Sequence, residues 1–317
     1  MKKFLIRIGL FVLPVILLAY PIDCIITSGL KKSRSFSYGK SAVWNDILQG
    51  QIHSDCIVLG SSRATQHIDP TMIERETGID TYNLGTDAHN VNMDMFKFDQ
   101  LLKYNTRPKY VIYSVDAFTL EKRPDLYGKD QFLPFIFQNE DMEQMSDNYE
   151  GFGWADFHIP LVRYIGELKA IKEGIGEHFK PSGEMRCKGY MPTDKAWEDD
   201  LAKAKKRMDA YHIAYDKESI KMFEDFLSEC KENRITLALI YTPEYIDGQK
   251  FIDKRDELID RYTKYAKENN ILFLDYSSDT LSYDKKFFYN SSHLNKDGSL
   301  IFTDKLVEDL KHHNFFK

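Results

Sequence analysis

Two short segments near opposite ends of the chain contain residue types suited to nucleophilic catalysis. One is the apolar run Ile57-Val-Leu59 followed by Gly60-Ser-Ser, and the other is the stretch 290–295, which contains His293. A serine hydroxyl becomes an effective nucleophile when a nearby imidazole accepts its proton. The oxyanion formed by its attack requires preorganised donors, and glycine allows the close backbone approach that supplies them. The two segments therefore predict a serine nucleophile and a histidine base that the fold must bring together.

Apolar runs of strand length alternate along the chain with amphipathic helical patterns. Strands are expected at Asp55–Leu59, Thr81–Leu84, Tyr110–Val115, Thr236–Tyr241 and Ile271–Tyr276, and helices at Met72–Thr77, Val91–Tyr104, Ile220–Asn233, Lys254–Asn269 and Lys296–His312. This alternation predicts an α/β fold: a three-layer sandwich of the flavodoxin-like kind, with a central parallel five-stranded sheet. Such sheets place active sites at the carboxyl ends of their strands, where Ser62 falls. His293 just precedes the last predicted helix, so it can fold back to the same edge.

In this order the motifs resemble those of the SGNH (GDSL-like) hydrolase superfamily, over most of residues 50–312 outside an insertion. By this resemblance Ser62 is the nucleophile and His293 is the base, while Ser61 occupies the position of the Asp in the family's Gly-Asp-Ser block. The resemblance also implies an oxyanion hole formed by the backbone N–H groups of Ser62 and Gly85. It implies no cofactor, and because the chain has no Cys-x-x-Cys spacing, no metal site is expected either.

One departure from the family's pattern concerns the residue that orients the histidine. Asn290 stands where the family has an Asp, and the resemblance gives it the orienting role. An Asn carbonyl accepts a hydrogen bond from an imidazole N–H, but it does not compensate the charge of the imidazolium. In chymotrypsin-type proteases the corresponding Asp-to-Asn change costs about 10⁴ in turnover. Asp284, six residues earlier, is a second candidate for orienting His293.

A second departure lies after the third predicted strand. Asp116 falls on the position of a family Asn whose side chain donates to the oxyanion, and an ionised carboxylate only accepts hydrogen bonds. Asn83 and Asn90 are nearby candidates for a replacement donor, although asparagines in loops commonly serve turns. Arg63, directly after the nucleophile, is expected either to bind an anionic group of the substrate or to form a salt bridge on a helix face. His67 is expected in a turn or capping role.

The alternation of strands and helices breaks over residues 120–215, which is too long for a structureless connection. Helical patterns at 161–175 and 197–210 predict a largely helical insertion. It is interpreted either as a cap over the strand ends that shapes substrate access or as a structural insertion remote from the site. The charged pattern over 199–207 is expected to be a solvated helix face without a role in the chemistry.

The N-terminus carries a compartment signal. Lys2, Lys3 and Arg7 precede an apolar segment from Ile8 to Leu30. As a helix this segment is roughly 34 Å long, at about 1.5 Å per residue, and the hydrocarbon core is about 30 Å thick. We expect an uncleaved signal-anchor or transmembrane segment at 1–30, a linker at 31–40, and a domain at 41–317 outside the cytoplasm, in the bacterial periplasm or at the cell surface. A cleaved signal peptide is the alternative.

The net charge of −6 gives no basic surface for nucleic acid, which is excluded as a partner. The resemblance is to membrane-anchored family members that handle acyl groups on surface polymers, in wall D-alanylation and in O-acetylation of exported polysaccharides. It implies a serine esterase or O-acyltransferase that acts on a cell-envelope or capsular polysaccharide. The expected partners are an acylated envelope glycan, the membrane and a membrane-embedded acyl exporter. The alternative is a catalytically weak domain that binds polysaccharide or acts as a scaffold in an export complex.

Overall fold

The computed structural model describes residues 2–317, except for the side chains of residues 2, 3, 5–12, 15 and 16. The chain folds into two compact units. Unit 1 comprises residues up to 46 together with 124–186, and unit 2 comprises residues 47–123 and 187–317. This division differs from the expected single domain at 41–317. Most of the predicted insertion belongs with the N-terminal residues, and its two ends, 120–123 and 187–215, belong to the unit that contains the sheet.

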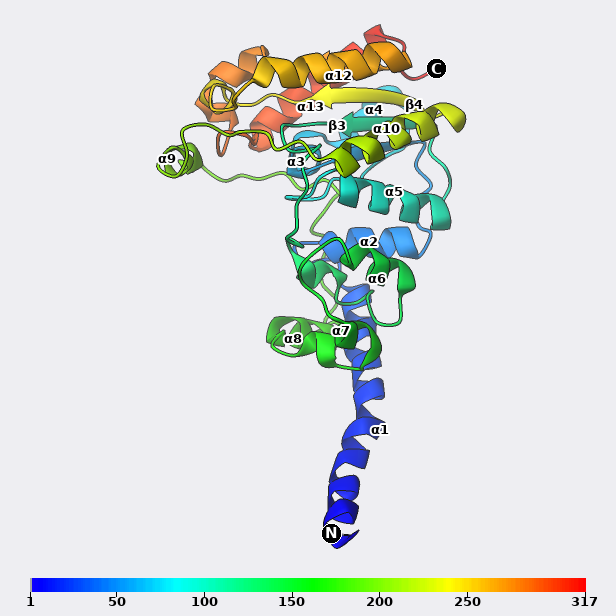
Figure 1. Cartoon of the computed structure of the whole chain (residues 1–317). Helices are drawn as coiled ribbons and strands as arrows, with labels where there is room; N and C mark the ends of the chain where they lie inside the picture. The colour runs from blue at the N-terminus through cyan, green and yellow to red at the C-terminus, as the bar shows by residue number, and fades with distance from the viewer. Residues whose placement is uncertain (1) are drawn as a thin grey trace. The chain divides into compact units, whose positions relative to one another are not determined.

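Unit 2 is built on a five-stranded parallel sheet (Figure 1). Its strands are β1 (Cys56–Gly60), β2 (Thr81–Asn83), β3 (Tyr110–Ser114), β4 (Thr236–Tyr241) and β5 (Leu272–Asp275). Their order is β2-β1-β3-β4-β5, which is that of flavodoxin-like doubly wound folds. The predicted parallel sheet and its five strands are confirmed, with ends that differ by at most one residue.

Helices cover both faces of this sheet. The helices of unit 2 are α3 (Ser62–His67), α4 (Pro70–Thr77), α5 (Val91–Tyr104), α9 (Asp200–Lys205), α10 (Lys217–Glu232), α11 (Ile246–Gln249), α12 (Arg255–Asn269) and α13 (Lys296–His312), with short 3₁₀ turns η3 (Thr280–Tyr283) and η4 (Lys285–Phe287). On one face Val58, Ile112 and Ile240 pack with α3, α4 and α13. On the other face the ring of Tyr113 contacts Phe226 of α10 at a centroid distance of 5.7 Å. Alternate residues of each strand therefore fill two cores, as a sheet covered on both sides requires.

Unit 1 is helical. It contains α1 (Lys2–Lys32), most of α2 (Lys40–Leu48), η1 (Lys129–Phe132), α6 (Glu140–Ser146), α7 (Trp154–His158), η2 (Val162–Tyr164) and α8 (Leu168–Gly176). Ile26 and Leu30 of α1 lie in its core together with Phe36 and Tyr164. The segment 31–40, expected as a polar linker, is thus part of a packed core.

The predicted membrane segment needs correction at its C-terminal end. Asp23, inside α1, is buried and forms an ion pair of 2.7 Å with the equally buried Arg163. The last turns of α1 therefore pack against protein instead of lipid. The side chains at 8–12, 15 and 16 of the predicted segment lie outside the described residues. Across the part of the chain that the structure describes, no helix has both the length and the apolar character needed to cross a bilayer.

Candidate active site

The turn after β1 places a serine at the carboxyl edge of the sheet. Gly60 has a φ of 128°, and the carbonyl oxygen of Ser114 on the neighbouring strand leaves no space for a Cβ at this position. Only glycine accommodates both constraints. Ser61 then caps α3, since its hydroxyl accepts a hydrogen bond from the backbone N–H of Arg63. Ser62 follows as the first residue of α3, half-buried at the rim.

The loop before α13 brings His293 to this serine. Ser62 Oγ and His293 Nε2 are 2.7 Å apart. On the other side of the ring, His293 Nδ1 is 3.0 Å from Asn290 Oδ1. The same oxygen also accepts hydrogen bonds from the backbone N–H groups of Ser292 and His293, at 3.1 and 2.9 Å. Because N–H groups only donate, they fix the orientation of the Asn290 amide with its oxygen toward the imidazole.

This orientation determines the tautomer of the histidine. Since Asn290 Oδ1 only accepts, we assign the proton of His293 to Nδ1, which also lies 3.1 Å from the Ser292 hydroxyl. Nε2 then accepts the Ser62 hydroxyl proton. Burial of the ring, together with the positive charge of Arg63, lowers the pKa of His293 to about 4. The imidazole is therefore neutral at neutral pH, which is the state that a general base requires.

Asp116 stabilises the turn that carries Ser61 and Ser62. β1 and β3 pair with Gly60 opposite Ser114, so Asp116, two residues further on, lies at the same edge as Ser61. The Ser61 hydroxyl donates to the Asp116 carboxylate at 2.6 Å, and Thr119 Oγ1 donates to the other carboxylate oxygen at 3.1 Å. Burial raises the pKa of Asp116. Asp116 thus holds the serine turn in place through hydrogen bonds accepted by both of its carboxylate oxygens.

Three predicted oxyanion donors have other partners in the structure. The N–H of Gly85 donates to Asn83 Oδ1 at 2.9 Å. The Asn83 amide in turn donates to the carbonyl oxygens of Ala64 and Ile68, at 2.7 and 2.9 Å, and the amide of Asn90 donates to the Glu121 carbonyl. The predicted donor role is wrong for Gly85, Asn83 and Asn90, because each of these donors instead fixes the loop after β2 or the start of α5.

Asp284 does not orient the histidine. Its carboxylate accepts from the backbone N–H of Lys286 at 3.1 Å and pairs with the ammonium of Lys286 at 2.9 Å. It caps the short turn η4 at an exposed position, whereas Asn290 occupies the place beside His293 Nδ1. The alternative that assigned the orienting role to Asp284 is wrong for this reason.

Arg63 forms a salt bridge, as one of its two predicted roles required, but it does so as a buried residue and not on a solvent-exposed helix face. Its guanidinium is 3.0 Å from the carboxylate of Glu244, and both side chains are almost inaccessible to solvent. It also donates to Thr242 Oγ1 at 3.0 Å. Glu244 and Thr242 lie just after β4. The contacts of Arg63 therefore link α3, which begins with Ser62, to the carboxyl end of β4. An ion pair of this kind positions elements and is not free to bind a substrate anion.

His67 is a positioning residue that the sequence did not reveal. Its Nε2 accepts the backbone N–H of Leu294 at 2.9 Å, and its Nδ1 lies 2.8 Å from Thr242 Oγ1. Burial lowers the pKa of His67 well below its ordinary value, so the ring is neutral and Nδ1–H donates to Thr242. His67 therefore ties α3, which begins with Ser62, to the residue after His293. No spacing signal marks it, because Leu294 becomes its neighbour only through the fold.

Comparisons with known proteins give little beyond this geometry. No protein-family model matches the chain, and no curated protein does. Among solved structures, it is similar to a GDSL-like lipase from Bacteroides thetaiotaomicron, with 11% identity, a TM-score of 0.40, and coverage of 85% of this chain and 98% of that one. It is also similar to a proposed lipolytic protein of the G-D-S-L family from Desulfitobacterium hafniense, with 14% identity, a TM-score of 0.38, and coverage of 80% and 98%. A third similar structure is a proposed acylhydrolase from Bacteroides fragilis, with 11% identity, a TM-score of 0.40, and coverage of 82% of this chain and 87% of that one. At these identities and TM-scores the likeness carries no argument about function.

Proposed function

We propose that the protein is a serine esterase or O-acyltransferase that works through an acyl-enzyme on Ser62. The observation that carries the proposal is the aligned series Ser62 Oγ, His293 and Asn290 Oδ1, with contacts of 2.7 and 3.0 Å. The fixed tautomer leaves the imidazole ready to accept the hydroxyl proton. A nucleophile, a base and a group that orients the base are the three parts that covalent acyl transfer requires.

The proposed reaction has two half-reactions. Ser62 Oγ attacks the ester carbonyl while its proton moves to His293 Nε2, and the tetrahedral oxyanion then expels the alcohol, which takes the proton from the imidazolium. The acyl group is now an ester of Ser62. Water or a sugar hydroxyl attacks this ester, again losing its proton to His293, and the acid or the new ester leaves as Ser62 recovers its proton. The acceptor therefore decides between hydrolysis and transfer.

The backbone is the proposed source of oxyanion donors. The N–H of Ser62 lies at the first position of α3, where helix N–H groups have no partner within the helix. Ala88, in the loop after β2, has a φ of 59° in the left-handed region. Ala88 follows Asp87, whose charge acts on His293, and a non-glycine residue held in this conformation near a candidate site is a reason to assign its loop a role. We assign the second donor to this loop, in place of Gly85.

Asn290 and the low pKa of His293 favour a second candidate function. A neutral amide does not stabilise the imidazolium, and an imidazole with a pKa of about 4 is a weak base. A slow or inactive domain that binds polysaccharide or acts as a scaffold in an export complex would have these properties. The two candidates differ in one observable, which is whether Ser62 becomes covalently modified by an acyl-enzyme mimic.

The test is labelling of the full-length protein with a fluorophosphonate. The reagent phosphonylates a serine Oγ with loss of fluoride, and intact mass measures the adduct. Label on the wild type that Ser62→Ala and His293→Gln abolish supports the enzyme, with Ser278→Ala as a control because Ser278 is an exposed serine of the same unit. No label on the wild type, or equal label on Ser62→Ala, favours the binding module.

For the acceptor we propose a glycan of the cell envelope or capsule, with an acyl exporter in the membrane as the source of acyl groups. This part rests on the resemblance of the Gly60-Ser-Ser-Arg63 and Ser291-Ser-His-Leu-Asn295 motifs to membrane-anchored family members that modify surface polymers. Acyl content of the purified envelope glycan, compared between wild-type and Ser62→Ala strains, tests it. Equal acyl content in the two strains contradicts it.

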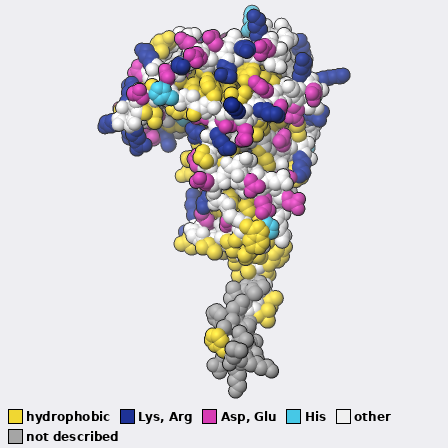
Figure 2. Space-filling view, in the orientation of Figure 1, with side chains coloured by type: hydrophobic (Ala, Val, Ile, Leu, Met, Phe, Trp, Pro, Cys, Tyr) yellow, Lys and Arg dark blue, Asp and Glu magenta, His cyan; other side chains and the backbone are white. Residues whose placement is uncertain are grey.

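We also propose that unit 1 contacts a membrane. Large apolar side chains are exposed on this unit, including Phe179 at 85% and Ile165 and Leu168 at 78% each. Figure 2 shows hydrophobic side chains gathered where α1 leaves the rest of the unit. Lys169 and Lys172 of α8 are next to this surface in sequence, and apolar side chains with flanking cations are typical of contact with anionic lipid.

Vesicle sedimentation of the full chain tests this contact. Vesicles of phosphatidylcholine and phosphatidylglycerol are expected to pellet the wild type, and the triple change Ile165→Ser, Leu168→Ser, Phe179→Ser is expected to lower the bound fraction. Ile301→Ser is the matched control, because Ile301 is an exposed apolar residue of unit 2. Equal binding of the triple variant and the control would contradict a role for this surface.

A location of the domain outside the cytoplasm is tested through its thiols. Cys187 is exposed, whereas Cys56 and Cys230 are buried. In a Cys24→Ser background, a membrane-impermeant maleimide applied to intact cells or spheroplasts should label Cys187. Labelling that requires lysis would contradict the proposal.

A further inference from the structure

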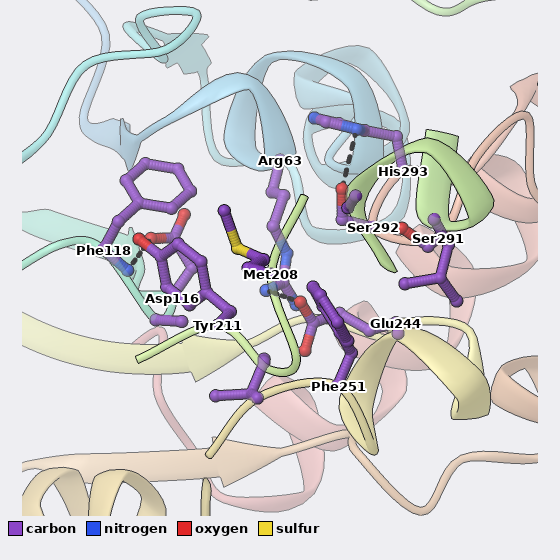
Figure 3. A pocket seen from close by; sticks show the side chains of 15 residues that line it. Arg63, Asp116, Phe118, Met208, Tyr211, Glu244, Phe251, Ser291, Ser292 and His293 are labelled. Carbon is purple, nitrogen blue, oxygen red and sulfur yellow. Dashed lines mark hydrogen bonds and ion pairs between the residues drawn. The ribbon is translucent and has the colours of Figure 1, made fainter. Parts of the chain in front are cut away.

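An apolar cavity of about 270 Å³ opens beside the histidine loop in unit 2 (Figure 3). Its apolar wall comes from residues of three separate segments of the chain: Phe118, Leu201, Ala204, Met208, Phe251 and Ile252. Pockets for drug-sized ligands occupy roughly 300–1,000 Å³, so this cavity suits a single short chain better than a saccharide.

Most polar groups at the cavity already have protein partners, and the exception is Arg63 Nη1, which is buried without a hydrogen bond. Arg63 and Glu244 neutralise each other, with 3.0 Å between their charged atoms. The hydroxyl of Tyr211 donates to the Glu121 carboxylate at 2.7 Å. Asp116 accepts from Ser61 and Thr119, as described above. A polar guest would find few groups free to bond with it and would lose its own hydration, whereas an apolar guest gains by leaving water.

The cavity adjoins the proposed catalytic atoms. Ser292 and His293 form part of its lining, and Figure 3 shows both at one end of it. Arg63, which follows Ser62 in the chain, and Asp116, which holds Ser61, also line it. Ser62 is not itself part of the lining, but its Oγ is 2.7 Å from Nε2 of His293, so a group attached to Ser62 lies next to a residue that lines the apolar space.

One wall of the cavity is fixed to the histidine loop by α9. The carboxylate of Asp200 accepts from both the backbone N–H and the hydroxyl of Ser291, each at 3.1 Å. Leu201 and Ala204 of this helix face the cavity, and Met208 follows them. The expectation that 199–207 is only a solvated helix face is therefore wrong for Leu201 and Ala204. The short helix α9 exposes Lys203 and Lys205 to solvent, while its apolar side lines the cavity.

We propose that this cavity binds the hydrocarbon chain of the acyl group carried by Ser62, and that α9 and Met208 set the chain length accepted. The proposal rests on the proposed acyl-enzyme and narrows its substrate class from acyl esters in general to esters of short unbranched alkanoic acids longer than acetate. Burial of each methylene is worth about a fourfold gain in kcat/KM, which corresponds to about 0.8 kcal/mol.

The first experiment is a chain-length profile with para-nitrophenyl acetate, butyrate, hexanoate and octanoate. The full-length wild type is expected to gain about fourfold per methylene until the cavity is filled and then to lose activity. Ala204→Trp fills the cavity and should lower the hexanoate-to-acetate ratio of kcat/KM at least tenfold. Met208→Ala enlarges it and should move the optimum to a longer chain. Lys203→Trp adds the same ring on the exposed side of α9 and should leave the profile as it is.

The second experiment separates the cavity from catalysis. Binding of 1-hexanol to Ser62→Ala is measured by calorimetry, with and without Ala204→Trp. Binding that Ala204→Trp abolishes supports the alkyl site even if no ester is turned over, in which case only the proposed reaction fails. A flat profile in an enzyme that hydrolyses the acetate overturns the acyl-chain role, and so does a Ser62→Ala protein that does not bind hexanol.

Discussion

Replacing Asn290 with Asp restores a carboxylate beside the imidazole and is expected to speed the proposed reaction. The new carboxylate oxygen would take the place of Oδ1, 3.0 Å from His293 Nδ1, and would still accept the backbone N–H groups of Ser292 and His293. The substitution therefore changes charge while keeping the hydrogen-bond pattern. Any change in rate then reports the electrostatic contribution of the orienting residue.

The magnitude follows from the distance and the burial. Opposite charges about 4 Å apart interact by about 1 kcal/mol in water and about 4 kcal/mol at the effective dielectric constant of a protein surface. At about 1.4 kcal/mol per pKa unit, the pKa of His293 should rise by about 1 to 3 units from its present value of about 4. Since the ring is half-buried, we take the middle of this range, a rise of about 2 units and about 10²-fold in rate.

The assay is the rate of fluorophosphonate labelling and of para-nitrophenyl ester hydrolysis as a function of pH. The base acts when His293 is neutral, so activity rises as pH increases through its pKa. The wild-type midpoint should lie near pH 4, and the Asn290→Asp midpoint should lie about 2 units higher. At pH 8 both imidazoles are neutral, and the variant should be about 10²-fold faster because its carboxylate stabilises the imidazolium of the transition state.

Asn290→Ala is the control, since it removes the acceptor without adding charge and should slow both reactions. An Asn290→Asp protein that is folded but has an unshifted midpoint would refute the placement of residue 290 beside the imidazole. A shifted midpoint without a faster rate would refute the argument that the missing charge limits turnover.

Three further substitutions test the frame that holds the site, each measured by urea unfolding. Arg63→Met leaves Glu244 buried without its partner and should cost about 3–5 kcal/mol, most of which the added change Glu244→Gln should restore; an additive double variant would contradict the ion pair. His67→Leu leaves the buried N–H of Leu294 unpaired, so it should lower the free energy of unfolding by about 1–3 kcal/mol and slow fluorophosphonate labelling. His67→Gln should recover part of the stability and part of the labelling rate. Normal labelling of His67→Leu would show that the position of His293 does not depend on His67. Gly60→Ala introduces a Cβ against the carbonyl of β3 at a φ of 128° and should cost more than about 1 kcal/mol, so an unchanged midpoint would contradict this turn geometry.

The sheet could be predicted because its signal is local. Runs such as Tyr110–Ser114 and Thr236–Tyr241 are apolar on both strand faces, and short runs of this kind separated by amphipathic helices allow few arrangements other than a covered parallel sheet. The division into two units was not predictable in the same way. Residues 124–186 show helical patterns, but nothing in them indicates that they pack with α1 in a unit separate from the sheet.

The N-terminal segment shows how composition alone misjudges an environment. Ile26 and Leu30 have the same apolar character as residues exposed earlier in α1, such as Leu17, yet they are buried in a protein core. Asp23 signalled the difference, because a carboxylate inside an apolar helix requires a partner. That partner, Arg163, is 140 positions away in the chain, so only the fold identifies it.

The sequence by itself determined which residues meet at the edge of the sheet. Ser62 follows the first strand and His293 precedes the last helix, and in a parallel α/β fold these positions converge at the carboxyl ends of the strands. The tertiary structure decided what surrounds them. Asn290 and not Asp284 faces His293, and Asn83 accepts the hydrogen bond of the Gly85 N–H. His67 binds the N–H of Leu294 in the histidine loop, and α9 lines an apolar cavity. The physical reason is that strand and helix patterns are set by neighbours along the chain. Hydrogen-bond partners and cavity walls depend on ångström-scale distances between loops, and only the packed chain fixes them.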